Sequence, residues 1–398
     1  MRMSFRRLPA AVAAAVVLLA ACDSTESNAP HGHDPVAARL FVNGTEITPT
    51  VALAGGSTVR VEVRLYDDED AEITGLATDH FTALSFSPGA LATVQAVAGN
   101  SFAWDVTADS AGGTGTLSVG YGHDAAADEK VFGPFAVDAA AAQVPVTLTF
   151  MPVVGAQDFA CGQNYTLGTP SATVTPIDFR MYVHDIRLVR ADSSEVALAL
   201  DQDSLWQYQD VALVDFEDGT GGCSNGTAET HPVVTGTAPY GSYSGIKFKL
   251  GLPFSLNHGD PTTAPSPLNL TALFWAWNSG YKFLRLDFSV DPSGTPVMHN
   301  LHLGSTGCNG TTATTPPTSC SEENVAEVVL SGFDPTSGHI MADAGALLGA
   351  SDLAVDGGGA PGCMSGTTDP DCTPIFPLLG LPFGATPAAP QVFFTGHP

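Results

Sequence analysis

Two tryptophans and three nearby histidines are the residues whose types and spacing could support chemistry. Trp275 and Trp277 lie two positions apart in LNLTALFWAWNSGYKFLRLDF, so both indoles would project from one face of an extended strand. His258 precedes this stretch, and His299 and His302 follow it. Indoles placed between imidazoles suggest a binding site, although aromatic side chains that fill a core would give the same pattern.

The segment VMHNLHL limits how many of its side chains can reach one site. On a strand, Met298 and His302 would share a face about 13 Å apart, too far to hold one metal ion. His299 would face the opposite way. We therefore expect one histidine of this segment near Trp275. His302 is favoured because the loop that follows it, residues 304–320, ends in a predicted disulfide.

Other kinds of chemistry find little support. No nucleophile elbow, zinc-protease, P-loop or dinucleotide-binding motif occurs in a fitting context, so we predict that the protein is not an enzyme. The carboxylates Asp215, Glu217 and Asp218 are more typical of a solvated turn than of an acid–base pair. The net charge of −27 excludes nucleic acid as a partner, because its binders need a basic face.

Composition and pattern predict an all-β protein with two domains. A chain of 398 residues exceeds one ordinary core, and 44% hydrophobic with 14% charged residues indicates globular folding. No sustained helical period follows the first segment, and frequent turn residues favour short strands. We expect an immunoglobulin-like β-sandwich at 36–138 and a larger, disulfide-stapled β-sandwich or barrel at 144–398. Its strands should include 179–189, 246–250 and 281–288.

The chain begins with an export signal. Arginines precede an apolar segment that is too short to span a bilayer as a mature helix. The segment ends in Leu-Ala-Ala-Cys, which resembles a bacterial lipobox, so residues 1–22 are predicted to be a lipoprotein signal with acylation at Cys22. Residues 23–35 would form a flexible tether. The protein would then lie in the periplasm or on the cell surface and contact the membrane only through its lipid anchor.

Six cysteines remain after Cys22, and an even number in an exported chain indicates disulfides. None of the spacings is C-x-x-C, which argues against a zinc ribbon. Several connectivities are open, but two close pairs in loops rich in Gly, Thr, Pro and Asp favour local bridges. We predict the pairs Cys308–Cys320, Cys363–Cys372 and Cys161–Cys223.

Residues 144–398 resemble the MbnP-like copper-binding proteins, also described as the four-Cys proteins of metallo-mystery pair systems. Each matching stretch is weak alone, but the combination is specific and follows the order of the family. The stretches are FRMYVHDIRLV, WQYQDVALVDFEDGTGGC, GIKFKLGLPFSLNHGDP, APSPLN, FWAWNSGYKFLRLDF, HLGSTGCNG and GCMSGTTDPDC. The predicted N-terminal sandwich lies outside the resemblance.

The resemblance implies a protein of copper homeostasis that binds one Cu(I). It also implies a dihaem partner enzyme of the MauG or cytochrome c peroxidase type, thought to oxidise the first Trp of a W-x-W motif to kynurenine. That residue corresponds to Trp275, with Trp277 beside it. An indole N–H has no free lone pair for a metal, whereas the aryl amine of kynurenine has one. The implied ligands are Trp275 as kynurenine, His258, His302 and, as a further candidate, Met364, and a thioether among imidazoles favours Cu(I).

A second hypothesis is a non-catalytic surface β-sandwich that adheres to protein or glycan. It would fit an immunoglobulin-like domain and an acidic, Thr-rich surface. The two hypotheses differ in what surrounds Trp275. A copper site needs histidines that converge on the indole, whereas a structural core would surround it with aliphatic side chains.

Overall fold

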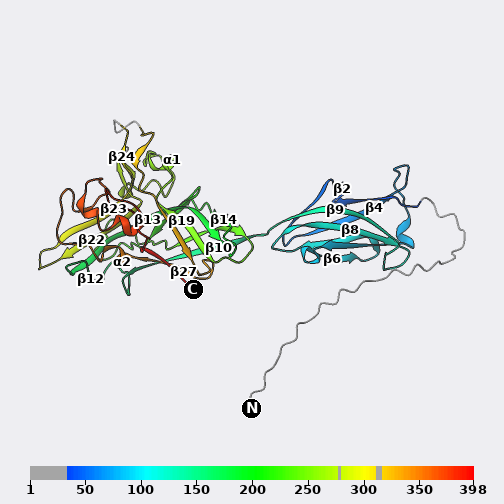
Figure 1. Cartoon of the computed structure of the whole chain (residues 1–398), viewed down its shortest axis with the longest axis horizontal. Coiled ribbons are helices and arrows are strands. Elements are labelled where there is room, and N and C mark those ends of the chain that lie inside the picture. Colours follow the sequence, from blue (N-terminus) through cyan, green and yellow to red (C-terminus); the bar gives the residue numbers. More distant parts are fainter. Residues whose placement is uncertain (1–33, 277–278, 311–315) are drawn as a thin grey trace, which may run out of the picture.

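The computed structural model describes residues 34–276, 279–310 and 316–398, and it confirms the all-β prediction. The signal segment, Cys22 and Trp277 lie outside the described residues. Figure 1 shows two β regions joined by a short connection between strands β9 and β10. We call strands β1 to β9 the N-terminal sandwich and strands β10 to β29 the C-terminal region. The described helices are short: α1 (Phe254–Asn257), α2 (Ala344–Leu348) and the 3-10 turns Leu76–Thr78, Gly89–Leu91, Thr271–Leu273, Pro370–Cys372 and Phe376–Leu379.

The N-terminal sandwich packs a five-stranded sheet on a four-stranded sheet, as the predicted immunoglobulin-like fold requires. Apolar residues alternate along its strands, so one face of each sheet enters a shared core. The first sheet, in the order β2-β1-β4-β7-β6, comprises β1 (Ala37–Val42), β2 (Thr45–Glu46), β4 (Thr58–Tyr66), β6 (Ala92–Val97) and β7 (Asn100–Ala108). The second, in the order β3-β9-β8-β5, comprises β3 (Thr50–Ala54), β5 (Phe81–Ser87), β8 (Gly113–Gly122) and β9 (Lys130–Ala140).

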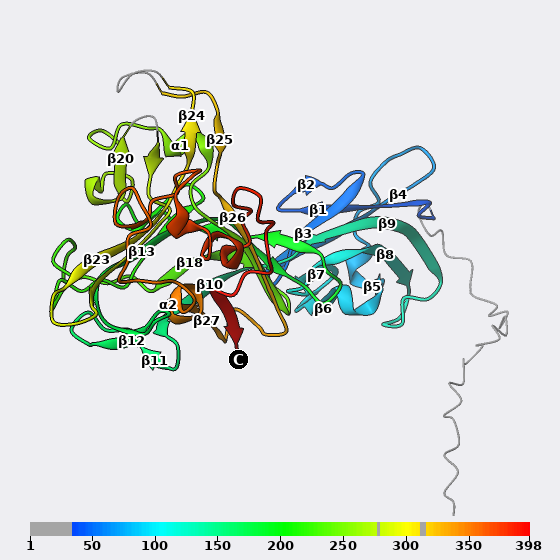
Figure 2. The same cartoon turned by 60° about the vertical axis from the view of Figure 1, so that its left-hand side comes forward.

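The C-terminal region also packs two sheets (Figure 2). The six-stranded sheet comprises β10 (Gln143–Val154), β11 (Gln157–Asp158), β15 (Ala199–Leu200), β18 (Val233–Pro239), β27 (His339–Asp343) and β29 (Phe394–His397). The ten-stranded sheet comprises β12 (Tyr165–Leu167), β13 (Ala172–Val189), β14 (Glu195–Ala197), β16 (Gln207–Tyr208), β17 (Val211–Asp215), β19 (Gly245–Leu250), β22 (Leu284–Asp291), β23 (Val297–Leu303), β26 (Ala326–Ser331) and β28 (Gly362–Cys363). Two small ribbons add β20 (Phe274–Ala276) with β21 (Gly280–Tyr281), and β24 (Thr306–Cys308) with β25 (Cys320–Glu322).

Aromatic rings join the two sheets of the C-terminal region. Phe150 and Phe394 belong to the six-stranded sheet and Phe248 to the ten-stranded sheet, and all three side chains are buried. Phe248 meets Phe150 and Phe394 edge to face, with ring centroids 5.8 and 5.1 Å away. The long central strand β13 pairs along its length with β12, β14, β17, β19 and β22, so it holds the ten-stranded sheet together.

The three disulfides pair as predicted: Cys161–Cys223, Cys308–Cys320 and Cys363–Cys372. All of them lie in the C-terminal region. The second joins β24 to β25, and the third closes the loop after β28. Two of the bridges therefore brace loops that follow β23, the strand that carries His302.

The strand expected at 281–288 is broken in the structure. Tyr281 ends the β20–β21 ribbon, and β22 begins at Leu284. Between them the chain changes its partners: the Lys282 N–H donates to the carbonyl of Leu273, and the Phe283 N–H donates to the carbonyl of Leu303. This change lets the ribbon that carries Trp275 leave the large sheet while it stays attached to the end of β23.

Candidate metal centre

Trp275 lies on the short ribbon strand β20 and is half-buried. Its benzene ring packs directly on Gly304, at the end of β23. A Cβ atom at position 304 would lie 2.8 Å from Cζ3 of the indole, closer than carbon atoms can approach. The absence of a side chain at Gly304 therefore brings the indole against the backbone that follows His302.

His302 is the histidine that contacts this indole. The ring centroids of Trp275 and His302 are 6.0 Å apart, with an angle of 54° between the planes. The register of β23 confirms the expected alternation, since His302 lies opposite Arg285 and His299 lies opposite Phe288 on β22. The two histidines therefore point to opposite faces of the sheet, and one of them reaches Trp275.

A buried carboxylate lies behind His302. Nε2 of His302 is 2.8 Å from Oδ1 of Asp287, and Asp287 also accepts a hydrogen bond from Nε of Arg285. The His302–Asp287 contact has the distance of an ion pair but not the alignment of a hydrogen bond. Among the described residues, neither ring nitrogen of His302 has an aligned hydrogen-bond partner, although both nitrogens are buried.

This environment favours a neutral His302 ring. Burial lowers the pKa of His302 below its ordinary value, although Asp287 acts in the opposite sense. A neutral imidazole is the form that binds metal, and a carboxylate beside one ring nitrogen is the usual companion of a metal-binding histidine. With Nε2 beside Asp287, Nδ1 is the nitrogen available for coordination. The buried, poorly paired imidazole therefore fits a metal ligand.

His258 is joined to the same site through its neighbour Asn257. Oδ1 of Asn257 accepts from the Tyr281 N–H on β21, and Nδ2 donates to Oγ of Ser305. One amide thus links the turn that carries His258, the ribbon that carries Trp275, and the segment just after β23. The His258 ring is buried and lies 4.8 Å from the ring of Phe254.

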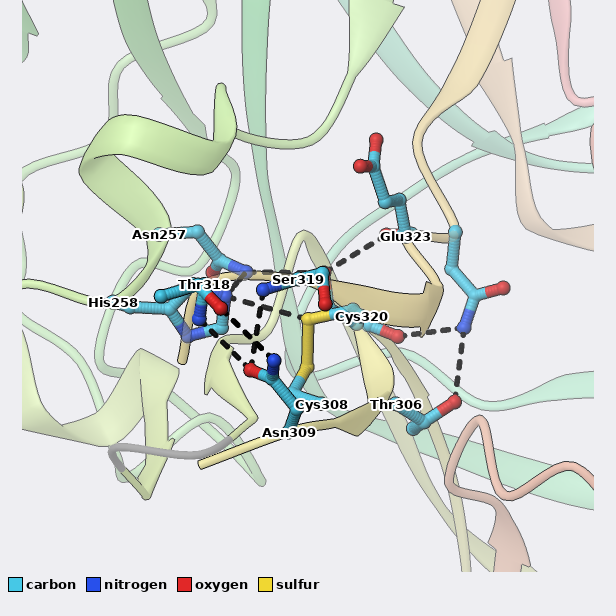
Figure 3. Close-up of a disulfide and its surroundings, with 12 residues drawn as sticks. Asn257, His258, Thr306, Cys308, Asn309, Thr318, Ser319, Cys320 and Glu323 are labelled. Atoms are coloured by element: carbon cyan, nitrogen blue, oxygen red, sulfur yellow. Dashed lines mark hydrogen bonds between the residues drawn. A yellow bond between two sulfur atoms is a disulfide. The ribbon is translucent and has the colours of Figure 1, made fainter. Parts of the chain in front are cut away.

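The His258 ring faces the Cys308–Cys320 disulfide (Figure 3). Its Nε2 lies 3.6 Å from Sγ of Cys320 and 3.3 Å from Nδ2 of Asn257. The ligand atoms of His258, Cys308 and Cys320 all lie within 4.8 Å of one another. Because both sulfur atoms are engaged in a disulfide, they offer no thiolate, and His258 is the member of this cluster that can bind a metal.

Met364 is brought beside β23 by the parallel pairing of β28. Leu301 lies opposite Cys363, so the next step in register brings the backbone of Met364 level with His302. The Ser365 hydroxyl confirms this proximity, because it donates to the carbonyl of His302 and accepts from the Gly304 N–H. The Cys363–Cys372 bridge holds this loop, and the Met364 side chain is half-buried.

The structure thus brings together Trp275 and His302, with the Met364 backbone adjacent and His258 linked through an amide. Trp277 lies outside the described residues, so its expected alignment with Trp275 stays a prediction. Sequence reasoning missed Asp287 and Asn257. The alternation of Arg285 and Asp287 with apolar residues in β22 was a usable signal, because charged residues on a core-facing strand need partners.

Comparison with known proteins identifies the C-terminal region. The sequence model of the MbnP family matches residues 143–365, more than half of the chain. The chain belongs to the MbnP family. Among solved structures, MbnP from Methylosinus trichosporium matches with a TM-score of 0.57 and 31% sequence identity, over 64% of this chain and 98% of that chain. Among curated protein sequences, no significant match is found.

Other solved structures match the chain more weakly. The adhesin InvE of Yersinia pseudotuberculosis has 13% identity over 70% of this chain and 62% of that chain. Domains 5-6 of the S-layer protein SbsC have 14% identity over 54% of this chain and 91% of that chain. Both TM-scores are 0.19, too low to carry an argument about fold or function. Within the described residues, no helix has the length and apolar character to cross a membrane.

Proposed function

We propose that this chain is a periplasmic or surface lipoprotein of copper homeostasis that binds a single Cu(I) beside Trp275. The observation that carries the proposal is the contact between Trp275 and the buried, carboxylate-backed ring of His302. Membership of the MbnP family supports the choice of copper. Acylation of Cys22 would anchor the protein, and the proposal assigns it no catalytic role.

The proposal requires oxidation of Trp275 to kynurenine by a dihaem MauG or cytochrome c peroxidase-like partner. Opening the pyrrole ring breaks its C2–C3 bond and inserts two oxygen atoms, which come from dioxygen or from two peroxide molecules handled by the partner. Water then hydrolyses the formyl group and formate leaves. The exposed aryl amine carries a lone pair, which the indole N–H lacks.

Each neighbouring residue has a defined part in the proposed site. His302 supplies Nδ1, with Asp287 fixing the ring as a positioning residue. Met364 supplies a thioether, which favours Cu(I) over harder ions. His258 is the more adjustable ligand, because its ring now faces Cys320 and must turn toward the metal. We therefore expect His302→Ala to weaken binding more than His258→Ala does.

The adhesion hypothesis predicts a different environment for Trp275. A purely structural tryptophan would be surrounded by aliphatic side chains, whereas here the indole contacts an imidazole and the Gly304 backbone. Polar groups at this depth are costly unless they are paired or functional. This environment favours the copper hypothesis.

The decisive experiment compares two tryptophan–histidine pairs in chains co-produced with the dihaem partner. Trp206 and His231 form a stacked pair in the same region, with ring centroids 4.9 Å apart, and serve as the matched control. Trp275→Phe should weaken Cu(I) binding at least about tenfold in a competition titration, because one ligand is lost. Trp206→Phe should retain wild-type affinity, and peptide mass spectrometry should find kynurenine at Trp275. Wild-type Cu(I) affinity in the Trp275→Phe protein would refute the proposal.

A second variant separates positioning from modification. Asp287→Asn should leave kynurenine formation intact but weaken Cu(I) binding roughly tenfold to a hundredfold, the usual effect of losing a carboxylate behind a metal-binding histidine. His302→Ala should produce a larger loss with the same intact modification. If Asp287→Asn changed the extent of modification but not the affinity of the modified protein, Asp287 would not be a positioning residue for His302. Unchanged affinity in His302→Ala protein would show that His302 is not a ligand.

A further inference from the structure

A cavity at one end of the N-terminal sandwich contains a pair of histidines that the copper proposal does not use. The cavity measures about 920 Å³, and its lining includes His80, Tyr121 and His123. It also includes Lys130, the first residue of β9. Figure 1 shows that β9 runs toward the connection with β10. Because its 11 residues span about 35 Å, Lys130 and the cavity beside it lie at the end of the strand remote from the C-terminal region.

The pairing of two strands brings the histidines together. Phe81 at the start of β5 lies opposite Gly122 at the end of β8. His80 and His123 are the next residues outward on these antiparallel strands, and their ring centroids are 4.1 Å apart, with an angle of 46° between the planes. His80 also stacks on Tyr121, with centroids 5.2 Å apart. The fold therefore fixes two imidazoles side by side at the cavity.

Each imidazole is held at the same nitrogen by a carboxylate. Nδ1 of His80 lies 2.6 Å from Oδ1 of Asp79. Nδ1 of His123 lies 2.8 Å from both carboxylate oxygens of Glu129. A carboxylate on one ring nitrogen fixes the tautomer and the orientation of the ring, and it directs the other nitrogen, Nε2, toward coordination. Finding this arrangement on both rings of one pair is the strongest indication of a metal site.

Acidic side chains dominate the lining of the cavity, and Asp79 and Glu129 are among them. Further carboxylates line the cavity, and Lys130 is paired with Asp34 at 2.7 Å. The field in the cavity therefore attracts cations.

We propose that this cavity binds one divalent transition-metal ion through Nε2 of His80 and Nε2 of His123. Two imidazoles completed by water oxygens suit Cu(II) and Zn(II), and the general order of affinities favours Cu(II). The site is distinct from the Cu(I) site at Trp275. All of its residues lie outside the stretch that matches the MbnP family, residues 143–365. The protein would thus bind oxidised metal on one region and Cu(I) on the other.

The test uses the untagged full chain, produced without the dihaem partner, and Cu(II) and Zn(II) as probes. We expect one tight Cu(II) equivalent, and Cu(II) should displace Zn(II) from the same site in competition. His80→Gln/His123→Gln should weaken Cu(II) binding at least about tenfold. The matched control is His339→Gln/His397→Gln, which removes a stacked pair in the C-terminal region with centroids 5.4 Å apart and should leave the affinity unchanged.

A second variant separates a metal site from a purely structural pair. Asp79→Asn/Glu129→Gln keeps both imidazoles but removes the groups that orient them, and should weaken Cu(II) binding roughly tenfold. Pulsed EPR of the wild type should show two coordinated imidazoles, and the same signal should persist in His258→Ala/His302→Ala protein and in His31→Gln/His33→Gln protein. The proposal is overturned if EPR shows no coordinated imidazole. The predicted tether, residues 23–35, also contains two histidines, His31 and His33. The proposal is equally overturned if binding survives in folded His80→Gln/His123→Gln protein and is lost in His31→Gln/His33→Gln protein.

Discussion

The N-terminal sandwich and the C-terminal region both contain an Arg–Asp pair on a sheet, but they place it in opposite environments. Arg60 and Asp105 are 3.0 Å apart, with side chains 50% and 35% exposed. Arg180 pairs with Asp178, and these side chains are 3% and 0% exposed. The exposed pair loses little hydration and contributes little to the free energy of folding. The attraction within the buried pair must offset the free energy that both charges lose when they leave water.

The buried pair is tolerated because it belongs to a larger set of charges. Asp178 also lies 3.1 Å from Arg285, and Arg285 donates a hydrogen bond to Asp287, the carboxylate behind His302. A continuous series of ion pairs thus runs from the sheet interior to the candidate copper ligand. The difference between the two regions indicates that the C-terminal core gives up apolar packing to fix His302.

The largest contrast between the regions should come from the disulfides. Cys161→Ser/Cys223→Ser opens a bridge between residues 62 apart in sequence and should lower the free energy of unfolding of the C-terminal region by about 4 kcal/mol. The N-terminal sandwich has no cysteine, so its unfolding should not change. Urea unfolding followed by fluorescence can separate them, because Trp104 reports on the sandwich, while Trp206 and Trp275 report on the other region. If the free energy of unfolding fell equally in both regions, the disulfide would not stabilise the C-terminal region alone, and the prediction would be wrong.

The buried ion pairs should produce the next largest effect. Asp178→Asn leaves Arg180 and Arg285 without the carboxylate that they share, and should destabilise the C-terminal region by about 3 kcal/mol. The same variant should weaken Cu(I) binding by the matured protein, because Arg285 also contacts Asp287. Calorimetry and Cu(I) competition measure the two effects. If Asp178→Asn lowered the stability but left the Cu(I) affinity unchanged, the ion pairs would have no influence on the metal site.

Asp215 gives the C-terminal region a pH dependence of its own. Burial raises the pKa of this carboxyl from 3.8 to about 7, so between these values the folded protein holds a proton that the unfolded chain has released. The free energy of unfolding therefore falls as pH rises through this window and then levels off. Asp215→Asn keeps the oxygen that accepts from the Glu217 N–H but cannot ionise. The variant should be more stable than the wild type by a few kcal/mol at pH 8 and equal to it near pH 4. A stability difference that does not depend on pH would be evidence against a raised pKa of Asp215.

The sequence predicted features that depend on local spacing, and it missed those that depend on long-range contacts. Alternating residues in VMHNLHL correctly separated His299 from His302, and loop composition correctly paired the cysteines. The amide of Asn257, by contrast, links residues 24 and 48 positions away. The sequence around Asn257 contains no pattern that predicts either partner. The break after Tyr281 escaped prediction for the same reason, because it arises from a change of hydrogen-bond partner and not from a turn residue.

The smallest predicted effect concerns the exposed pair of Arg60 and Asp105. Asp105→Asn removes a carboxylate that accepts two hydrogen bonds from Arg60, at 3.0 and 3.1 Å, so its geometry is as good as that of the buried pair. Water can solvate Arg60 as soon as its partner is lost, whereas the Arg180 side chain is 3% exposed and has much less access to water. We therefore expect no resolvable change in the unfolding of the N-terminal sandwich at physiological ionic strength. A loss of stability comparable to that of Asp178→Asn would show that geometry, and not burial, sets the strength of these pairs. The proposed link between buried charge and the metal site would then lose its physical basis.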